Sequence, residues 1–172
     1  VLKIQLSGAV GAGNSSITKE VQTFAAEILS LKAASSWQSL RGSLVEWSSF
    51  LGILSGNLGK MAKDISLLMQ TEVAEVFEGA AEGKGGSSTM PHKRNPVGCA
   101  AILANANRVP ALVSTMLSNM LQEHERSAGL WHAEWETLQD LMLLTGGSIE
   151  KSVDLIKNLE VDEKRMATNL EM

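Results

Sequence analysis

The sequence predicts an all-α protein built as a bundle of long helices. Apolar residues recur at steps of three and four over three stretches, residues 43–78, 97–122 and 133–158. That spacing is typical of one face of an α-helix, and no stretch shows the alternation of apolar and polar residues that indicates a half-buried strand. One long interruption, from Gly79 to Gly98, is rich in glycine and proline. We therefore expect a helix bundle with a single long loop.

The N-terminal part is predicted to contain a glycine-rich turn and one shorter helix. A short apolar piece leads into the turn, which runs from Ser7 to Gly13. Because the turn lacks the spacing of a phosphate-binding loop, we expect its glycines to serve close backbone packing. From Ser16 to Ala34 the apolar spacing predicts a scaffold helix with one apolar face. The residues of that face are Val21, Phe24, Ile28 and Leu31.

The longest helix signal runs from Ser43 to Glu78. Its apolar residues form a heptad seam: Trp47, Leu51, Leu54, Leu58, Met61, Ile65 and Leu68. A helix of about 36 residues would be roughly 54 Å long, which is too long to be covered within one small domain. We therefore expect its partners to be other long helices. Glycine costs a helix about 1 kcal/mol, so Gly52, Gly56 and Gly59 are expected to mark points of close helix approach.

Two more long helices are predicted after the loop. The first covers residues 97–122, and Pro110 is expected to kink it or divide it, because an interior proline removes a backbone hydrogen bond. The second covers residues 133–158, where Gly146 and Gly147 are expected to weaken the middle of the helix.

A further helix is predicted to begin after Asp162, because an aspartate side chain can cap the first free N–H groups of a helix. We expect a central helical-bundle domain over residues 1–160, with its loop at 79–98, and the start of a truncated C-terminal domain over 161–172. The chain begins without methionine and ends within a helical pattern, which indicates a fragment.

Composition and charge restrict the class of function. The chain has 172 residues, 44% of them apolar, and a mean hydropathy of +0.04, which is typical of a soluble protein. No run approaches about 18 uninterrupted apolar residues, so we expect no membrane span, and no signal peptide is visible. A net charge of −4 argues against a nucleic-acid partner. The single cysteine, Cys99, excludes an internal disulfide, favours a small buried residue and is typical of a reducing compartment such as the cytoplasm.

The loop concentrates polar chemistry between two apolar helices. Its serine hydroxyls, Ser87 and Ser88, could on composition alone belong to a flexible linker. Cationic and imidazole side chains gather beside them in an otherwise acidic protein: Lys84, His92, Lys93 and Arg94. A site with one sign of charge attracts ligands of the other sign, so we expect an anionic ligand.

The eleven residues from Gly86 to Pro96, GSSTMPHKRNP, resemble the signature loop GSSxMPxKxNP of the fumarase/aspartase superfamily. The resemblance covers essentially the whole chain. It implies a central long-helix bundle, a homotetramer with shared active sites, and cleavage or formation of a C–O or C–N bond beside a carbon alpha to a carboxylate. Ser87 matches the catalytic base of that superfamily. Three further residues match positions that bind substrate carboxylates: Ser88, Lys93 and Asn95.

The proposed base requires help from its surroundings. Removing a proton alpha to a carboxylate builds negative charge, so the site needs both a base and groups that hold this charge. A serine can act as the base only if its alkoxide is stabilised. The amides of Gly85 and Gly86 and the charge of Lys93 could supply that stabilisation.

A second stretch narrows the resemblance within the superfamily. Residues 124–135, HERSAGLWHAEW, are similar to a stretch of the 3-carboxy-cis,cis-muconate cycloisomerases, whereas adenylosuccinate lyases continue differently after HER. Trp37 stands where the cycloisomerases carry Trp and adenylosuccinate lyases usually carry Gln. The resemblance implies a small polycarboxylate substrate bound by Trp37, Arg126 and His132. Gly42 departs from the pattern, because relatives usually have Asp in this position.

Three functions follow as alternatives. The first is a cycloisomerase that converts 3-carboxy-cis,cis-muconate to 4-carboxymuconolactone, in the protocatechuate branch of aromatic catabolism. The second is an adenylosuccinate lyase-like C–N lyase, and the third is a catalytically silent helical assembly module. No cofactor is implied, and no metal is expected, because position 128 is alanine and HExxH is absent. The general acid is expected to be a histidine outside this chain.

Overall fold

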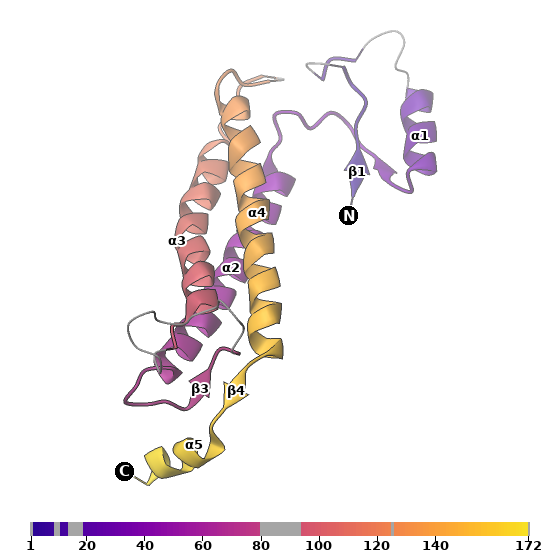
Figure 1. Cartoon of the computed structure of the whole chain (residues 1–172). Helices are drawn as coiled ribbons and strands as arrows, with labels where there is room; N and C mark the ends of the chain where they lie inside the picture. The colour runs from indigo at the N-terminus through magenta and orange to yellow at the C-terminus, as the bar shows by residue number, and fades with distance from the viewer. Residues whose placement is uncertain (1, 9–10, 14–18, 80–93, 125, 172) are drawn as a thin grey trace. The chain divides into compact units, whose positions relative to one another are not determined.

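The computed structural model describes residues 2–8, 11–13, 19–79, 94–124 and 126–171, and it confirms the predicted all-α class (Figure 1). The helices are α1 (Lys19–Ile28), α2 (Gly42–Leu68), α3 (Val97–Ser118), α4 (Leu130–Lys157) and α5 (Glu163–Leu170). The strands have two residues each: β1 (Lys3–Ile4), β2 (Lys32–Ala33), β3 (Val76–Phe77) and β4 (Glu160–Val161).

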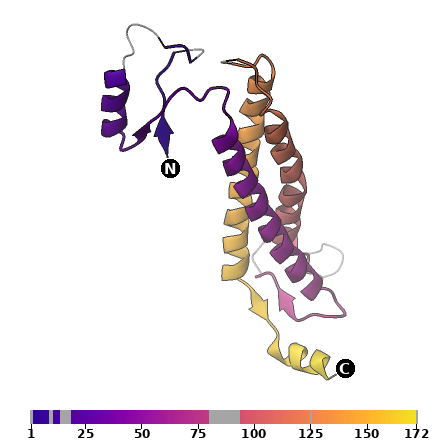
Figure 2. The same ribbon diagram turned by 180° about the vertical axis from the view of Figure 1, so that it is seen from behind.

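The chain forms two compact units. Unit 1 contains residues 1–47 and 114–138, and unit 2 contains residues 48–113 and 139–172. Within unit 1, β1 and β2 pair in parallel. Within unit 2, α2, α3 and α4 run side by side (Figures 1 and 2), and β3 pairs with β4 in antiparallel register. The predicted division near residue 160 stays a prediction.

The apolar core of unit 2 lies where its long helices meet the strand pair. It consists of Ala62, Ile65, Met69, Val76, Cys99, Ile102 and Leu155. Burial, with the nearby carboxylate of Glu78, raises the pKa of the Cys99 thiol to about 12, so the thiol stays protonated at neutral pH. The expectation of a small buried cysteine is confirmed. Among the described helices, α3 is long and apolar enough to cross a membrane, a test that core helices of soluble proteins also pass.

Helix α2 is shorter than the sequence predicts. It ends at Leu68 after 27 residues, about 40 Å, instead of continuing to Glu78. Ala74 adopts a positive φ of 53°, and the Glu75 N–H donates to the Leu68 carbonyl at 3.1 Å. The chain then enters β3. The prediction was wrong here because neither glycine nor proline marks this turn.

The three glycines of α2 differ in their surroundings. A Cβ added at Gly52 would lie 2.9 Å from the Val113 side chain, and one added at Gly59 would lie 2.7 Å from the Ala106 Cβ. Both are points of close approach between α2 and α3, as predicted. Gly56 has nothing within 4 Å of such a Cβ, so the described residues make no close approach at that position.

The predicted heptad seam of α2 is buried only in part within the chain. Leu51 and Ile65 are buried, but Trp47 is 47% exposed. Small residues take much of the buried face instead: Ser48, Ser55, Gly59 and Ala62. The seam therefore contributes Leu51 and Ile65 to the buried face of α2, and its other residues lie at the edge of that face.

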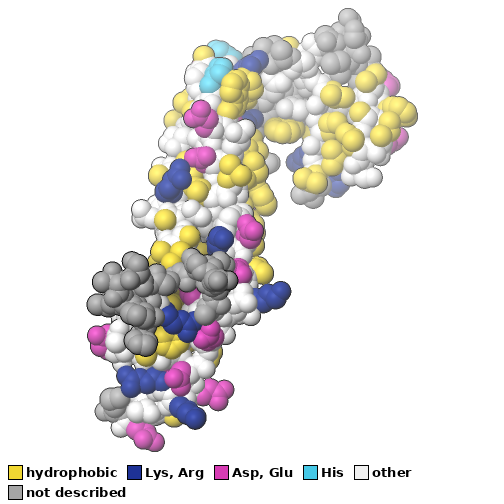
Figure 3. All heavy atoms as spheres, viewed as in Figure 1, with side chains coloured by type: hydrophobic (Ala, Val, Ile, Leu, Met, Phe, Trp, Pro, Cys, Tyr) yellow, Lys and Arg dark blue, Asp and Glu magenta, His cyan; other side chains and the backbone are white. Residues whose placement is uncertain are grey.

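Helix α1 also differs from the prediction. It ends at Ile28, because Ser30 adopts a positive φ of 53° and the chain continues into β2. Its predicted apolar face is exposed, with Phe24 65% and Ile28 68% accessible (Figure 3). The residues before Lys19, from 14 to 18, lie outside the described residues.

Of the remaining helix predictions, the structure shows no break at Pro110, Gly146 or Gly147, and it confirms the cap of α5. Helix α3 contains Pro110 without interruption, so the proline does not divide it. Helix α4 likewise continues through Gly146 and Gly147. The Asp162 side chain accepts a hydrogen bond from the Arg165 N–H at 2.9 Å, which confirms the predicted N-cap of α5.

Candidate active site

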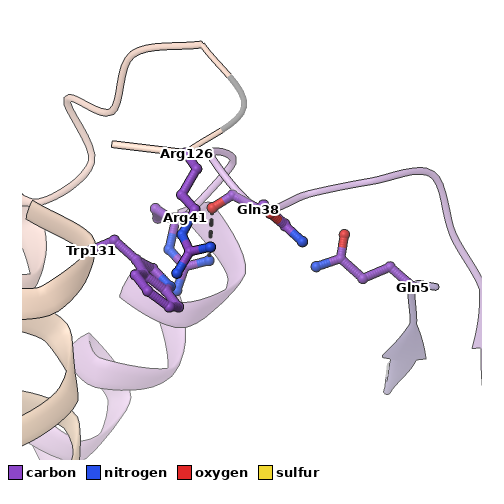
Figure 4. A pocket seen from close by; sticks show the side chains of 5 residues that line it. All are labelled: Gln5, Gln38, Arg41, Arg126 and Trp131. Carbon is purple, nitrogen blue, oxygen red and sulfur yellow. Dashed lines mark hydrogen bonds between the residues drawn. The ribbon is translucent and has the colours of Figure 1, made fainter. Parts of the chain in front are cut away.

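A pocket in unit 1 gathers side chains from three separate segments. It has a volume of about 370 Å³ and is lined by Gln5, Gln38, Arg41, Arg126 and Trp131 (Figure 4). Gln5 follows β1, and Gln38 and Arg41 precede α2. Arg126 lies in the segment before α4, and Trp131 lies in the first turn of α4. Small-molecule sites are typically pockets of roughly 300–1,000 Å³ with a few convergent polar groups, so this pocket suits a small polar ligand.

The cation and the aromatic wall of the pocket lie against each other. The Arg126 guanidinium carbon lies 3.9 Å from the centroid of the Trp131 ring, within the range of a cation–π interaction. The His132 ring lies beside the same tryptophan, with ring centroids 5.2 Å apart. The structure thus brings together two of the predicted substrate-binding residues, Arg126 and His132. Both side chains are exposed.

Trp37 lies next to the pocket wall without lining it. Its backbone N–H donates to Gln5 Oε1 at 2.6 Å, and the following Gln38 donates from Nε2 to the Gly8 carbonyl at 2.8 Å. Its indole Nε1 is buried and makes no hydrogen bond within the described structure. These bonds join the segment before α2 to the glycine-rich turn. A Cβ at Gly11 would lie 2.3 Å from Ser36 Oγ, which confirms close packing there.

Arg41 and Glu134 form a buried ion pair at the pocket. Arg41 Nε donates to Glu134 Oε1 at 2.9 Å, and its Nη2 bonds the other carboxylate oxygen. The side chains are 7% and 4% exposed. Gln122 Nε2 donates to the same Oε1 at 3.1 Å. An arginine that bonds both oxygens of one carboxylate has a fixed orientation.

In unit 2, the residues on either side of the loop at 79–98 bond to each other. The Glu78 carboxylate accepts the N–H groups of Gly98 at 2.9 Å and Cys99 at 2.8 Å, which caps the first turn of α3. Arg94 pairs with Glu160 at 2.8 Å and also donates to the Glu78 carbonyl. Arg94 is among the cations that were expected to attract an anionic ligand. Its contacts instead bind the C-terminal end of the loop to Glu160 in β4.

Ser87, Ser88 and Lys93 lie outside the described residues, so their predicted roles stay predictions. Asn95 is half-buried just before α3, and its carbonyl accepts the Val97 N–H at 2.9 Å.

Sequence reasoning missed four residues of the pocket and its support: Gln5, Gln38, Arg41 and Glu134. The amides carry no periodic signal. Arg41 and Glu134 lie 93 positions apart, so nothing local in the sequence pairs them. The one available signal was Glu134, a charged residue between Trp131 and Trp135 near the start of α4. Among the described residues no group of three His, Cys, Asp or Glu side chains could hold a metal ion.

Comparison with known proteins identifies relatives of this chain. The sequence profile of the family described as lyase matches residues 1–111. The 3-carboxy-cis,cis-muconate cycloisomerase of Acinetobacter baylyi is 51% identical over 99% of this chain and 39% of its own length. Nitrosuccinate lyase of Streptomyces davaonensis is 37% identical, over 99% of this chain and 38% of its own length.

A solved structure of the same kind of enzyme is also similar to this chain in fold and sequence. The crystal structure of the 3-carboxy-cis,cis-muconate lactonizing enzyme from Pseudomonas putida superposes with a TM-score of 0.89 at 46% identity. It covers 99% of this chain and 38% of that enzyme. The chain therefore spans about two fifths of the length of the relatives it matches.

Proposed function

Because the chain belongs to the lyase family, within the fumarase/aspartase superfamily, we propose that the complete protein is a 3-carboxy-cis,cis-muconate cycloisomerase. The reaction closes the substrate to 4-carboxymuconolactone, a step in the protocatechuate branch of aromatic catabolism. One carboxylate oxygen adds to a carbon of a double bond, and a proton is delivered to the neighbouring carbon, which is alpha to another carboxylate. The step is an elimination run backwards within one molecule.

Ser87 is the proposed proton-transfer group. In the elimination direction its alkoxide would remove the alpha proton, so in the lactone-forming direction its hydroxyl would return that proton. Ser88, Lys93 and Asn95 are proposed to hold substrate carboxylates, where negative charge develops. Lys93 would also stabilise the serine alkoxide. The partner histidine is proposed to come from a part of the protein outside this chain.

The pocket of unit 1 is the observation that carries the proposal. A carboxymuconate is a flat, conjugated trianion, which needs cations near its carboxylates and an apolar wall for its diene. Arg126 stacked on Trp131, with the amides of Gln5 and Gln38 nearby, offers those groups. Charged hydrogen bonds contribute about 1.5–3 kcal/mol each, so such a pocket can discriminate among polycarboxylates.

The test is a paired assay on the complete protein. Loss of conjugated-diene absorbance with 3-carboxy-cis,cis-muconate is expected, without cleavage of adenylosuccinate in a parallel reaction. Efficient nucleotide cleavage with no lactone would contradict the proposal and support the C–N lyase alternative. Inactivity toward both substrates would support a silent assembly module.

We also propose that the protein is a homotetramer with shared active sites. Large apolar side chains are exposed on the long helices, including Phe50 and Ile53 on α2 and Leu143 and Val153 on α4. Exposed apolar area of this kind is typical of surfaces that bind another chain. Sedimentation of the complete protein should give a tetramer, and an active monomer would contradict this. A cytoplasmic location is proposed from the single cysteine.

A further inference from the structure

The Arg41–Glu134 ion pair is the most deeply buried charged contact beside the pocket. Both side chains are almost excluded from water, at 7% and 4% exposure. Burying two charges is costly, and breaking one partner leaves the other uncompensated. Such a pair contributes little net stability compared with well-packed apolar residues, but its bonds fix the positions of the groups that they join.

The remaining donor of Arg41 reaches the backbone of the pocket wall. Its Nη1 donates to the Gln38 carbonyl at 3.1 Å, the bond drawn as a dashed line in Figure 4. Gln38 in turn donates to the Gly8 carbonyl at 2.8 Å. A continuous set of bonds therefore joins the start of α4, the segment before α2 and the glycine-rich turn.

These contacts argue against Arg41 as a direct ligand of the substrate. Two of its nitrogens face the Glu134 carboxylate, and the third bonds the Gln38 carbonyl. Its charge is already matched by a carboxylate at bonding distance. That carboxylate comes from α4, 93 positions further along the chain.

We propose that Arg41 and Glu134 are positioning residues of the substrate pocket. The Arg41 guanidinium, oriented by Glu134, holds the Trp37–Gln38 segment against the glycine-rich turn. It therefore sets the distance between the side chains that line the substrate pocket. This inference rests on the proposed function and deepens it, because it assigns substrate affinity to two residues that bind no substrate atom.

Arg41→Lys in the complete protein is the principal variant. Lysine keeps the charge, but a single ammonium cannot bond both Glu134 oxygens and the Gln38 carbonyl in the same geometry. The pocket walls bind the substrate equally in the ground and transition states. We therefore expect KM for 3-carboxy-cis,cis-muconate to rise about ten-fold while kcat changes less than about two-fold.

A merely structural role gives a different result. It would reduce the amount of folded enzyme and hence the apparent kcat, while the folded fraction kept its KM. An unchanged KM in Arg41→Lys would therefore overturn the proposal. Arg108→Lys is the matched control, since Arg108 pairs with Asp140 at 3.3 Å in an exposed contact, and its KM should not change. If Arg41→Lys does not fold, Glu134→Asp keeps both charges and should raise KM in the same direction.

Binding of propane-1,2,3-tricarboxylate separates this inference from the proposed reaction. The compound has no double bond and cannot cyclise, so calorimetry reports binding even if the unaltered protein does not turn over the muconate. Arg41→Lys should weaken this binding about ten-fold, and Arg108→Lys should leave it unchanged. Equal binding by all three proteins, or no binding by the unaltered protein, would overturn the positioning role.

Discussion

The two compact units hold their segments together by different means. Unit 2 contains a cluster of seven buried apolar residues, contributed by its long helices and the β3 strand. Unit 1 joins its segments through directed polar contacts, among them Arg41 with Glu134, Gln38 with Gly8, and Gln22 with the Ile4 carbonyl. Apolar packing contributes stability without direction, whereas hydrogen bonds fix geometry. Substitutions in the apolar core of unit 2 should therefore change stability, and substitutions at the pocket of unit 1 should change binding.

The largest expected effect is on the core of unit 2. Ile102 is fully buried in the apolar cluster. Ile102→Ala removes that packing and should lower the free energy of unfolding by about 2–5 kcal/mol, measured by thermal or urea unfolding. Leu121→Ala is the control, because Leu121 is 82% exposed. Similar losses from both variants would contradict the contrast between core and surface.

Ser87→Ala tests chemistry instead of packing. Ser87 belongs to the signature loop, and its proposed role is confined to the transition state. Its replacement should lower kcat by on the order of 10² or more and leave KM nearly unchanged, measured by the loss of diene absorbance. Unchanged turnover would mean that another group transfers the proton.

Arg126→Ala tests recognition in unit 1. The guanidinium stacks on Trp131 at the pocket, and losing one charged contact to a carboxylate should raise KM roughly ten- to a hundred-fold. The melting temperature should stay close to that of the unaltered protein, because Arg126 is exposed. An unchanged KM, or a stability loss as large as that of Ile102→Ala, would contradict the claim that Arg126 contributes to binding and not to stability.

The smallest expected effect concerns the start of α2. Gly42 begins the helix, and a Cβ there would meet nothing within 4 Å. Gly42→Asp should raise the free energy of unfolding by about 0.3–1 kcal/mol, because a carboxylate in the first turn interacts favourably with the helix dipole. Gly59→Ala provides the contrast, since its Cβ would lie 2.7 Å from the Ala106 Cβ. That variant should be destabilised, and stabilisation by both would contradict the account of helix packing.

Much of unit 2 could be predicted from the sequence, because its long helices follow apolar periodicity. The periodic signal located α2, α3 and α4. The capping chemistry of Asp162 located the start of α5. The periodic signal could not locate the end of α2, where Ala74 takes a positive φ without a glycine to mark it. It also could not say which apolar face of α2 is buried within the chain, because periodicity does not identify the partner.

Less of the pocket could be predicted, because contacts between distant positions assemble it. Arg126 and His132 could be predicted as substrate-binding residues because both belong to the continuous stretch HERSAGLWHAEW, which resembles known enzymes. The structure places both beside Trp131. Arg41 and Glu134 are joined only by the fold. Arg94 was grouped with the cations of the loop, yet its partner Glu160 lies 66 positions away in β4.

The most direct measurement is a crystal structure of the complete protein with propane-1,2,3-tricarboxylate bound. We expect a carboxylate within about 3.2 Å of the Arg126 guanidinium, with the rest of the ligand between the Trp131 ring and the amides of Gln5 and Gln38. The Arg41–Glu134 pair should remain intact beside it. A ligand bound elsewhere, with this pocket holding only water, would contradict the assignment of a substrate-binding role to the pocket of unit 1.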